Sequence, residues 1–296
     1  MDAPDLRLAD GTILRGRAWP ADRPGRGTVV VVHGLGEYIG RHAPVARFLN
    51  GLGFDAIGFD QRGHGRSDGL RGRIPTDDAL LADLAAVLDR ARAVHRGGAF
   101  VLLGHSLGGA VAARFVAEGL SARPRPWARP VDHLVLSSPA LATHAGWPTR
   151  ALANVLGSLL PDLPLGNGLS PDWLSRDPAV VADYRRDPIV HDRIAPRLAR
   201  FLFAAGTDVR ARAPRWRTPT TLLWSGADRC VAPAGSATFL GAAPSGIVDG
   251  TCFPTLRHEL FNEPERATVF AALAASLEAA LDNRHRPQPA PSEATP

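Results

Sequence analysis

The sequence contains no lysine, so all 34 of its basic residues are arginine, and its formal net charge is +5. These arginines are dispersed among proline and apolar residues, and no predicted helix combines basic residues with interleaved aromatic ones. Nucleic-acid-binding proteins concentrate basic charge on one face or along one helix. We therefore expect a solvated surface and no nucleic-acid partner.

Cysteine is nearly absent as well, because Cys230 and Cys252 are the only two in 296 residues. Neither lies at a metal-ligand spacing, so the sequence indicates neither a disulfide framework nor a zinc site. We expect no metal and no organic cofactor. Buried, inert thiols are the default interpretation of both cysteines, and the sequence leaves their redox state open.

Long hydrophobic runs are missing too. No uninterrupted apolar stretch approaches the ~20 residues that a membrane-spanning helix needs. The first residues show no basic region followed by an apolar core, so we expect no signal peptide. These absences predict a cytoplasmic protein.

What the chain does contain is an alternation of apolar runs with helix-forming segments. Strands that alternate with helices predict an α/β fold with a mostly parallel central sheet and helices on both faces. Residues 6–19, with a turn at Asp10-Gly11, predict an N-terminal hairpin. We expect the main strands at 28–32, 54–59, 99–103, 132–136, 220–224 and 246–248.

The segment 139–214 breaks this alternation with a leucine-rich stretch, a proline- and glycine-rich stretch and a polar helical piece. We expect an inserted helical cap there, so that residues 1–138 and 215–283 form the α/β core. The leucine-rich stretch has no dense basic face, so we expect transient contact with a membrane surface at most. Residues 284–296 are polar and rich in proline, which predicts a disordered tail.

The most informative motif is Gly-His-Ser-Leu-Gly at residues 104–108. It follows an apolar run and passes directly into the helix-forming segment 110–115. A sharp turn between a strand and a helix exposes a serine as a nucleophile, so we predict that role for Ser106. A second Gly-x-Ser-x-Gly, at 65–69, adjoins neither a strand nor a helix, and we interpret Ser67 as a loop serine.

A serine that attacks an acyl carbon needs a base and an acid that orients this base. In sheets of this type both follow the nucleophile, the acid first and the histidine second. Asp228 follows the strand 220–224 in a turn and is the predicted acid, with Asp249 as the runner-up. Only His258 and His285 come later, and His285 lies in the predicted tail, so His258 is the predicted base.

The oxyanion of an acyl-transfer intermediate needs hydrogen-bond donors. One donor should be the backbone N–H of Leu107, the residue after the nucleophile. The second should come from the loop after an early strand. In that loop, residues 33–36, the glycines leave backbone amides free to point inward, and the Leu35 N–H is the candidate.

Together these residues resemble the α/β-hydrolase superfamily. Within it they resemble most the monoacylglycerol lipase and lysophospholipase group, also described as serine aminopeptidase S33-like hydrolases. The resemblance is carried by residues 33–37 with Arg41, by 60–67, 104–109 and 226–228, by His258-Glu259 with Asn262-Glu263, and by 175–178 and 187–191.

The resemblance implies that Glu37 and Arg41 shape the polar end of the substrate pocket, where a glycerol-like alcohol would lie. A local ion pair that holds the loop is the alternative role for these two residues. The resemblance also implies that the cap lines an acyl tunnel. Tyr38-Ile39 differ from the residues usual in the group, so the head-group preference stays open.

Three hypotheses of function follow. The first is a serine carboxylic-ester hydrolase that cleaves a monoacylglycerol or a lysophospholipid, a small-molecule acyl ester, through an acyl-enzyme on Ser106. The second keeps the same residues but acts on small esters or amides, or transfers the acyl group to another acceptor. The third is a ligand-binding protein that keeps the fold without turnover. Acyl length, head group and oligomeric state are not readable from the sequence.

Overall fold

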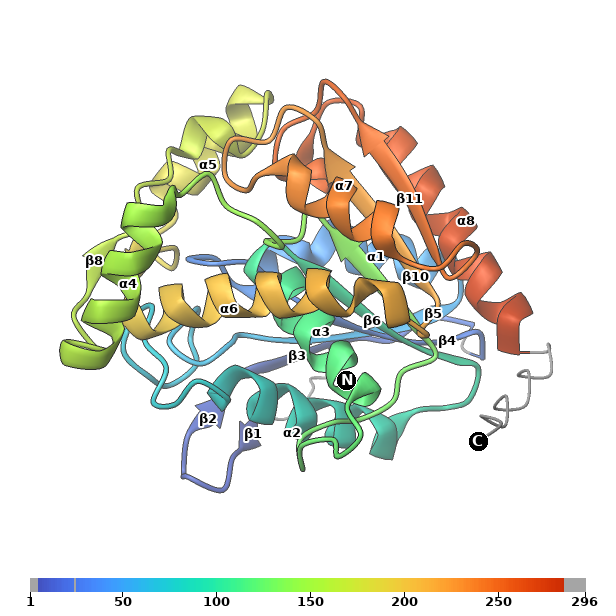
Figure 1. Cartoon of the computed structure of the whole chain (residues 1–296). Coiled ribbons are helices and arrows are strands. Elements are labelled where there is room, and N and C mark those ends of the chain that lie inside the picture. The colour runs from blue at the N-terminus through green and yellow to red at the C-terminus, as the bar shows by residue number, and fades with distance from the viewer. Residues whose placement is uncertain (1–4, 24, 285–296) are drawn as a thin grey trace.

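The computed structural model describes residues 5–23 and 25–284. Its centre is a seven-stranded sheet in the order β11-β10-β7-β6-β4-β5-β3, in which every neighbouring pair is parallel except β3 with β5 (Figure 1). The predicted mostly parallel sheet is confirmed. The strands are β3 (Gly16–Trp19), β4 (Gly27–Val32), β5 (Phe54–Phe59), β6 (Ala99–His105), β7 (His133–Ser137), β10 (Thr220–Ser225) and β11 (Val248–Phe253).

Helices cover both faces of this sheet, as predicted (Figure 1). One face packs against α2, α3, α6 and α7, and the other packs against α1 and α8. None of the described helices is both long and apolar enough to cross a membrane. The helices are α1 (Ala43–Gly51), α2 (Ala79–Val94), α3 (Leu107–Ala117), α4 (Trp147–Leu159), α5 (Pro178–Arg186), α6 (Pro196–Arg212), α7 (Pro233–Ala242) and α8 (Arg266–Arg284).

An apolar core lies on each face of the sheet, which explains why the central strands are continuous apolar runs in the sequence. Successive side chains of a strand point to opposite faces of the sheet. In β4, Val30 and Val32 join the cluster with α2 and α3, whereas Val29 and Val31 join the cluster with α1 and α8. A strand covered on both faces must therefore be apolar at every position.

The two ends of the sheet differ from the prediction in detail. Within 6–19, only β1 (Leu6–Arg7) and β2 (Ile13–Leu14) form the hairpin, because β3 leaves it to pair with β5. The last strand, expected at 246–248, is β11 and runs from Val248 to Phe253.

The segment between β7 and β10 contributes to two layers. Its helix α6 places Leu198, Phe201 and Val209 in the core cluster beside α3, whereas α4 buries only Gly157. A short ribbon of β8 (Leu165–Gly166) and β9 (Arg193–Ile194) lies between them in the sequence.

The domain boundaries stay a prediction, with residues 139–214 as a cap and the rest as a core. Of the predicted disordered tail, Arg284 is the last residue of α8. Residues 285–296 lie outside the part of the chain that the structure describes.

Candidate active site

Ser106 lies in the sharp turn that joins β6 to α3. Its backbone has φ 55° and ψ −119°, in the left-handed region that residues with a side chain rarely adopt. Such a conformation costs on the order of 1–3 kcal/mol and persists only where the surroundings hold it. Here the Ser106 N–H donates to Ser137 O at 3.0 Å, and Ser106 O accepts from the N–H of Ala140 at 3.0 Å.

Glycines on both sides of Ser106 allow this turn. A Cβ on Gly104 would lie 2.5 Å from Gly108 O, and a Cβ on Gly108 would lie 2.2 Å from Val32 O. Both distances are too short for any side chain. The start of α3 therefore touches the backbones of β6 and β4, which fixes Ser106 at the carboxyl end of the sheet.

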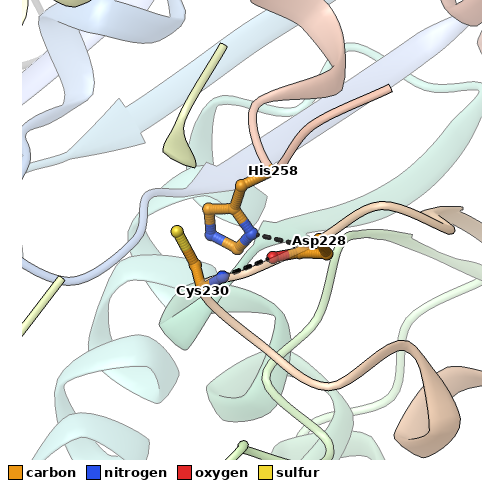
Figure 2. A group of neighbouring side chains, drawn as sticks. All are labelled: Asp228, Cys230 and His258. Atoms are coloured by element: carbon orange, nitrogen blue, oxygen red, sulfur yellow. Dashed lines mark hydrogen bonds and ion pairs between the residues drawn. The ribbon is translucent and has the colours of Figure 1, made fainter. Parts of the chain in front are cut away.

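The structure brings Ser106, Asp228 and His258 together. His258 Nδ1 lies 2.7 Å from Asp228 Oδ2 (Figure 2). His258 Nε2 lies 2.8 Å from Ser106 Oγ. The runner-up acid, Asp249, is exposed within β11. His285 is outside the described residues.

Hydrogen bonds and burial set the charges of this group. Asp228 Oδ1 accepts from the N–H of Cys230 at 2.8 Å and of Val231 at 3.0 Å. Burial raises the pKa of Asp228, but the His258 ring and these N–H groups outweigh it and leave the pKa lowered. Burial lowers the pKa of His258, but the Asp228 carboxylate outweighs it and leaves that pKa raised. The carboxylate therefore stays ionised and favours a proton on Nδ1, with Nε2 facing Ser106.

The two predicted oxyanion donors lie beside Ser106. Leu107 is the first residue of α3, and Leu35 lies in the loop after β4; both line the same cavity as Ser106. Among the described residues, neither N–H donates a hydrogen bond to the protein. The neighbouring Gly34 N–H is occupied, because it donates to Glu37 Oε1 at 2.6 Å. Leu35 and Leu107 thus offer free N–H groups near the Ser106 hydroxyl.

Glu37 and Arg41 form a buried ion pair, with Glu259 as a third member. The Arg41 guanidinium donates to the two Glu259 oxygens at 2.6 and 2.8 Å and to Glu37 Oε2 at 3.1 Å. It also lies over the Tyr184 ring, 4.7 Å from the ring centroid. Burial raises the pKa of Glu37, but His42 and Arg41 outweigh it and hold the pKa well below its usual value. The local ion pair is present, and a role in substrate binding stays a prediction.

Two cavities meet at Ser106, each with a volume of about 460 Å³. Ser106 and Leu35 line both of them. The polar cavity is lined by Glu37, Arg41, Tyr184, Arg185, Asp187, His191, Asp192 and Glu259, among others. The apolar cavity is lined by Leu107, Leu152, Ala153, Leu156, Leu202 and Val231, among others. The nucleophile candidate therefore has a charged space on one side and a hydrocarbon-like space on the other.

The wall of the polar cavity is fastened to the loop after β4. The Tyr38 hydroxyl donates to Asp187 Oδ2 at 2.8 Å. The backbone N–H of His191 donates to Gly36 O at 2.8 Å. Both bonds join residues 187–191 to the same loop that carries Leu35, so this wall and the predicted oxyanion donor are held in one unit.

Several residues of the site carry no sequence signal that marks them. His144 Nε2 lies 3.2 Å from Asp228 O and 3.1 Å from Val231 O, so it supports the loop that carries the acid. Tyr184 covers Arg41. Glu259 adjoins the predicted base in the sequence, but no sequence pattern indicates its bond to Arg41. These contacts join segments far apart in the sequence.

Ser67 and the cysteines complete the account of the predicted residues. The buried Ser67 hydroxyl accepts from the Arg15 N–H at 2.8 Å and donates to Asp60 O, which fits a loop serine. Both cysteines are free thiols. Cys230 is buried as expected, but Cys252 is exposed, because β11 extends further than predicted and carries it out at the edge of the sheet.

Comparison with known proteins adds an independent line of evidence. A family model described as "Serine aminopeptidase, S33" matches residues 23–265. The chain is 35% identical over 254 residues to the monoacylglycerol lipase of Mycolicibacterium smegmatis, which covers 85% of this chain and 88% of that protein. It is 33% identical over 247 residues to the monoglyceride lipase of Homo sapiens, with 82% and 79% covered. The crystal structure of the Paleococcus ferrophilus monoacylglycerol lipase superposes with a TM-score of 0.80 at 33% identity, over 90% of this chain and 99% of that one.

Proposed function

The chain belongs to the serine aminopeptidase S33 family of α/β-hydrolases, and we propose that it cleaves carboxylic esters through an acyl-enzyme on Ser106. Its similarity to monoacylglycerol lipases puts it in the lipase and esterase group of that family. The observation that carries the proposal is the pair of hydrogen bonds from Ser106 to His258 and from His258 to Asp228, at 2.8 and 2.7 Å. A nucleophile, its base and the acid that orients the base need these contacts.

In the proposed mechanism, His258 Nε2 accepts the Ser106 proton while Oγ attacks the ester carbonyl. The N–H groups of Leu35 and Leu107 receive the oxyanion, and each such donor typically contributes ~3 kcal/mol to the transition state. His258 then gives the proton to the leaving alcohol. A water molecule activated by His258 releases the fatty acid, and Asp228 offsets the imidazolium charge in both steps.

The two cavities support an amphiphilic substrate. An acyl chain fits the apolar cavity, and an alcohol with hydroxyl groups fits the polar one. Carboxylates outnumber guanidinium groups in the lining of the polar cavity, which includes Glu37, Asp187, Asp192 and Glu259 but only Arg41 and Arg185. Like charges repel most strongly where water is scarce. This balance favours an uncharged glycerol over a phosphate-bearing head group, and we propose a monoacylglycerol as the substrate.

We also propose that the protein takes this substrate from a lipid surface by transient contact. Large apolar side chains are exposed along α4 and just after it, including Trp147 at 81% and Leu159 at 72%. Leu152, on the same helix, is both exposed and part of the apolar cavity lining. An exposed apolar patch beside a cavity for an acyl chain is typical of a surface that meets lipid.

Hydrolysis of p-nitrophenyl esters from acetate to palmitate tests the proposal, with Ser106→Ala as the control. We expect turnover of medium and long chains that the variant abolishes. Turnover restricted to acetate would support the small-ester alternative, and no Ser106-dependent turnover would support a binding protein. The rate on a 1-monoacylglycerol is then compared with that on a lysophospholipid of the same acyl chain, and a faster lysophospholipid would contradict the head-group assignment.

A further inference from the structure

Cys230 is a side chain that the proposed mechanism does not use, although it lies inside the site. It is buried and lines the apolar cavity beside Ser106. One donor atom each from Asp228, Cys230 and His258 lie within 4.8 Å of one another. Figure 2 shows the Cys230 sulfur next to the imidazole ring, on the side away from Asp228. Within residues 5–23 and 25–284 this is the only group of three such donors.

A thiolate, an imidazole and a carboxylate form the ligand set that Zn²⁺ and similar cations prefer. A Zn–S bond of about 2.3 Å and a Zn–N bond of about 2.0 Å place sulfur and nitrogen roughly 3.5 Å apart in a tetrahedral site. The three donor atoms lie no more than 4.8 Å apart, so rotation about the Cys230 Cα–Cβ bond has only a short gap to close. The charges also match, because a thiolate and the Asp228 carboxylate together neutralise a divalent cation.

We propose that Cys230 and His258, with Asp228 beside them, form an inhibitory binding site for Zn²⁺ and related soft divalent cations. The cation would bind the lone pair of His258 Nε2 and the sulfur of Cys230, and the thiol proton would pass to the solvent. His258 Nδ1 keeps its bond to Asp228. With its lone pair occupied, Nε2 cannot accept the Ser106 proton, so hydrolysis stops until the cation leaves.

The protonated state of the Cys230 thiol favours a cation over covalent modification. Burial raises the pKa of Cys230, and the charge of Asp228 raises it further, so the side chain is a protonated thiol at neutral pH. A protonated thiol is a poor nucleophile. A soft cation can still displace its proton, because the bound metal stabilises the thiolate. The cation reaches the His258 imidazole through the polar cavity, and the Cys230 sulfur lies on the apolar cavity that meets it at Ser106.

The inhibitory effect rests on the proposed function and is tested by Zn²⁺ titration of ester hydrolysis in a thiol-free buffer. We compare the wild type with Cys230→Ser and with Cys252→Ser, which makes the same exchange at the other, exposed cysteine. We expect micromolar Zn²⁺ to inhibit the wild type and Cys252→Ser, and a chelator to restore both. Cys230→Ser should need at least tenfold more Zn²⁺. Equal sensitivity of all three proteins would overturn the proposal.

Binding is tested separately from hydrolysis, so that failure of the proposed function remains distinguishable. Cd²⁺ is titrated into Ser106→Ala protein, and the ultraviolet thiolate-to-cadmium charge-transfer band is recorded. We expect a band that saturates at one cation per chain, persists with added Cys252→Ser and disappears with added Cys230→Ser. A band that survives the loss of Cys230, or no band in Ser106→Ala, would overturn the site. Cys230→Ala replaces Cys230→Ser if circular dichroism shows that the latter is unfolded.

Discussion

The two cavities at Ser106 differ in how their walls are built. The polar cavity has a wall joined to the rest of the protein by specific bonds, such as Tyr38 to Asp187 and Arg41 to Glu259. The apolar cavity is closed in part by α4, which buries only Gly157 and exposes large apolar side chains to solvent. One wall is held by directional polar contacts and the other by non-directional apolar ones.

This difference would suit two tasks of the proposed monoacylglycerol hydrolase. Directional hydrogen bonds fix the position of whatever binds near them, so the polar side is suited to setting the register of the alcohol against Ser106. Apolar contact has no preferred direction, so the side formed by α4 can admit acyl chains of different lengths. We therefore expect changes on the polar side to alter head-group selectivity, and changes on α4 to alter chain-length selectivity.

The largest expected loss of activity does not depend on which of the two cavities the substrate occupies. Replacing Asp228 by Asn removes the carboxylate that orients His258, a group that serves substrates in both cavities. We expect kcat to fall by about 10⁴-fold on every ester tested, measured by steady-state kinetics. Asp249→Asn makes the same exchange at an exposed position of β11 and should stay within twofold of the wild type. If the Asp228→Asn variant keeps a tenth of the activity, Asp228 is not the acid that orients His258.

The pH dependence of kcat/KM tests whether the carboxylates of the polar cavity change their ionisation in the same pH range as His258. The pKa of His258 is raised above 6.5, and protonated His258 cannot accept the Ser106 proton. Glu37 and Glu259 have lowered pKa values and stay ionised in this range. We expect kcat/KM to fall about tenfold per pH unit below the pKa of His258, equally for a monoacylglycerol and a p-nitrophenyl ester. An acid limb seen with only one of the two substrates would show that the polar wall titrates.

Replacing Arg41 by Met should lower the stability of the protein and should lower activity most on substrates that use the polar cavity. Glu37 and Glu259 would lose their shared partner while still buried, which costs about 3–5 kcal/mol of the free energy of unfolding. We expect kcat/KM to fall at least tenfold more for a monoacylglycerol than for a p-nitrophenyl ester of the same chain. Arg186→Met, at an exposed ion pair with Asp183, should change stability by less than about 1 kcal/mol. Equal losses on both substrates would remove the head-group role. Denaturant unfolding and steady-state kinetics measure the two effects.

On the apolar side, a bulky residue should shorten the accepted chain. Ala153 lies on α4 and lines the apolar cavity, so Ala153→Phe should lower kcat/KM for palmitate about tenfold and leave acetate unchanged, since each displaced methylene contributes roughly 1 kcal/mol or more. Ala151→Phe, on an exposed position of the same helix, is the matched control. A uniform loss over all chain lengths would indicate that the acyl chain lies elsewhere.

The smallest effect concerns the lipid surface. Leu159→Ser removes an exposed leucine at the end of α4, and we expect partition onto phosphatidylcholine vesicles to fall about three- to tenfold, in line with the ~25 cal/mol per Å² of apolar area lost. Hydrolysis of a dissolved p-nitrophenyl ester should not change. Val94→Ser, at an exposed apolar residue of α2, should leave partition unaltered. Equal losses from both variants would show that α4 is not the contact surface. Vesicle sedimentation gives the partition coefficients.

The parts of this protein that local sequence can predict are those set by backbone geometry. The turn around Ser106 needs glycines where backbones touch, as Gly108 touches Val32 O. The Gly-x-Ser-x-Gly motif shows these glycines directly. Strands covered on both faces can also be predicted from the sequence, since a strand such as β4 is buried at every position and must be apolar throughout. The approach of Asp228 and His258 to Ser106 followed from chain order at the ends of parallel strands.

What the sequence did not predict depends on contacts between distant segments. No spacing rule connects Arg41 with Glu259, which lie 218 residues apart. The support that His144 gives to the Asp228 loop comes from a segment without regular periodicity. The resemblance implied a polar end and an acyl tunnel, but the volumes of the two cavities could not be predicted, because they depend on how α4 and α5 pack over the sheet.

One backbone contact limits how this protein can be redesigned. The loop of His258 is joined to residues that precede α5, through the Glu259 N–H to Leu174 O at 2.8 Å and the Ser175 hydroxyl to Asn262 O at 2.8 Å. An exchange of the whole segment 139–214 for that of a relative would therefore disturb the base itself, whatever its effect on selectivity. A graft that retains residues 171–177 and replaces only α4 and its flanks would change the acyl side and leave the histidine in register.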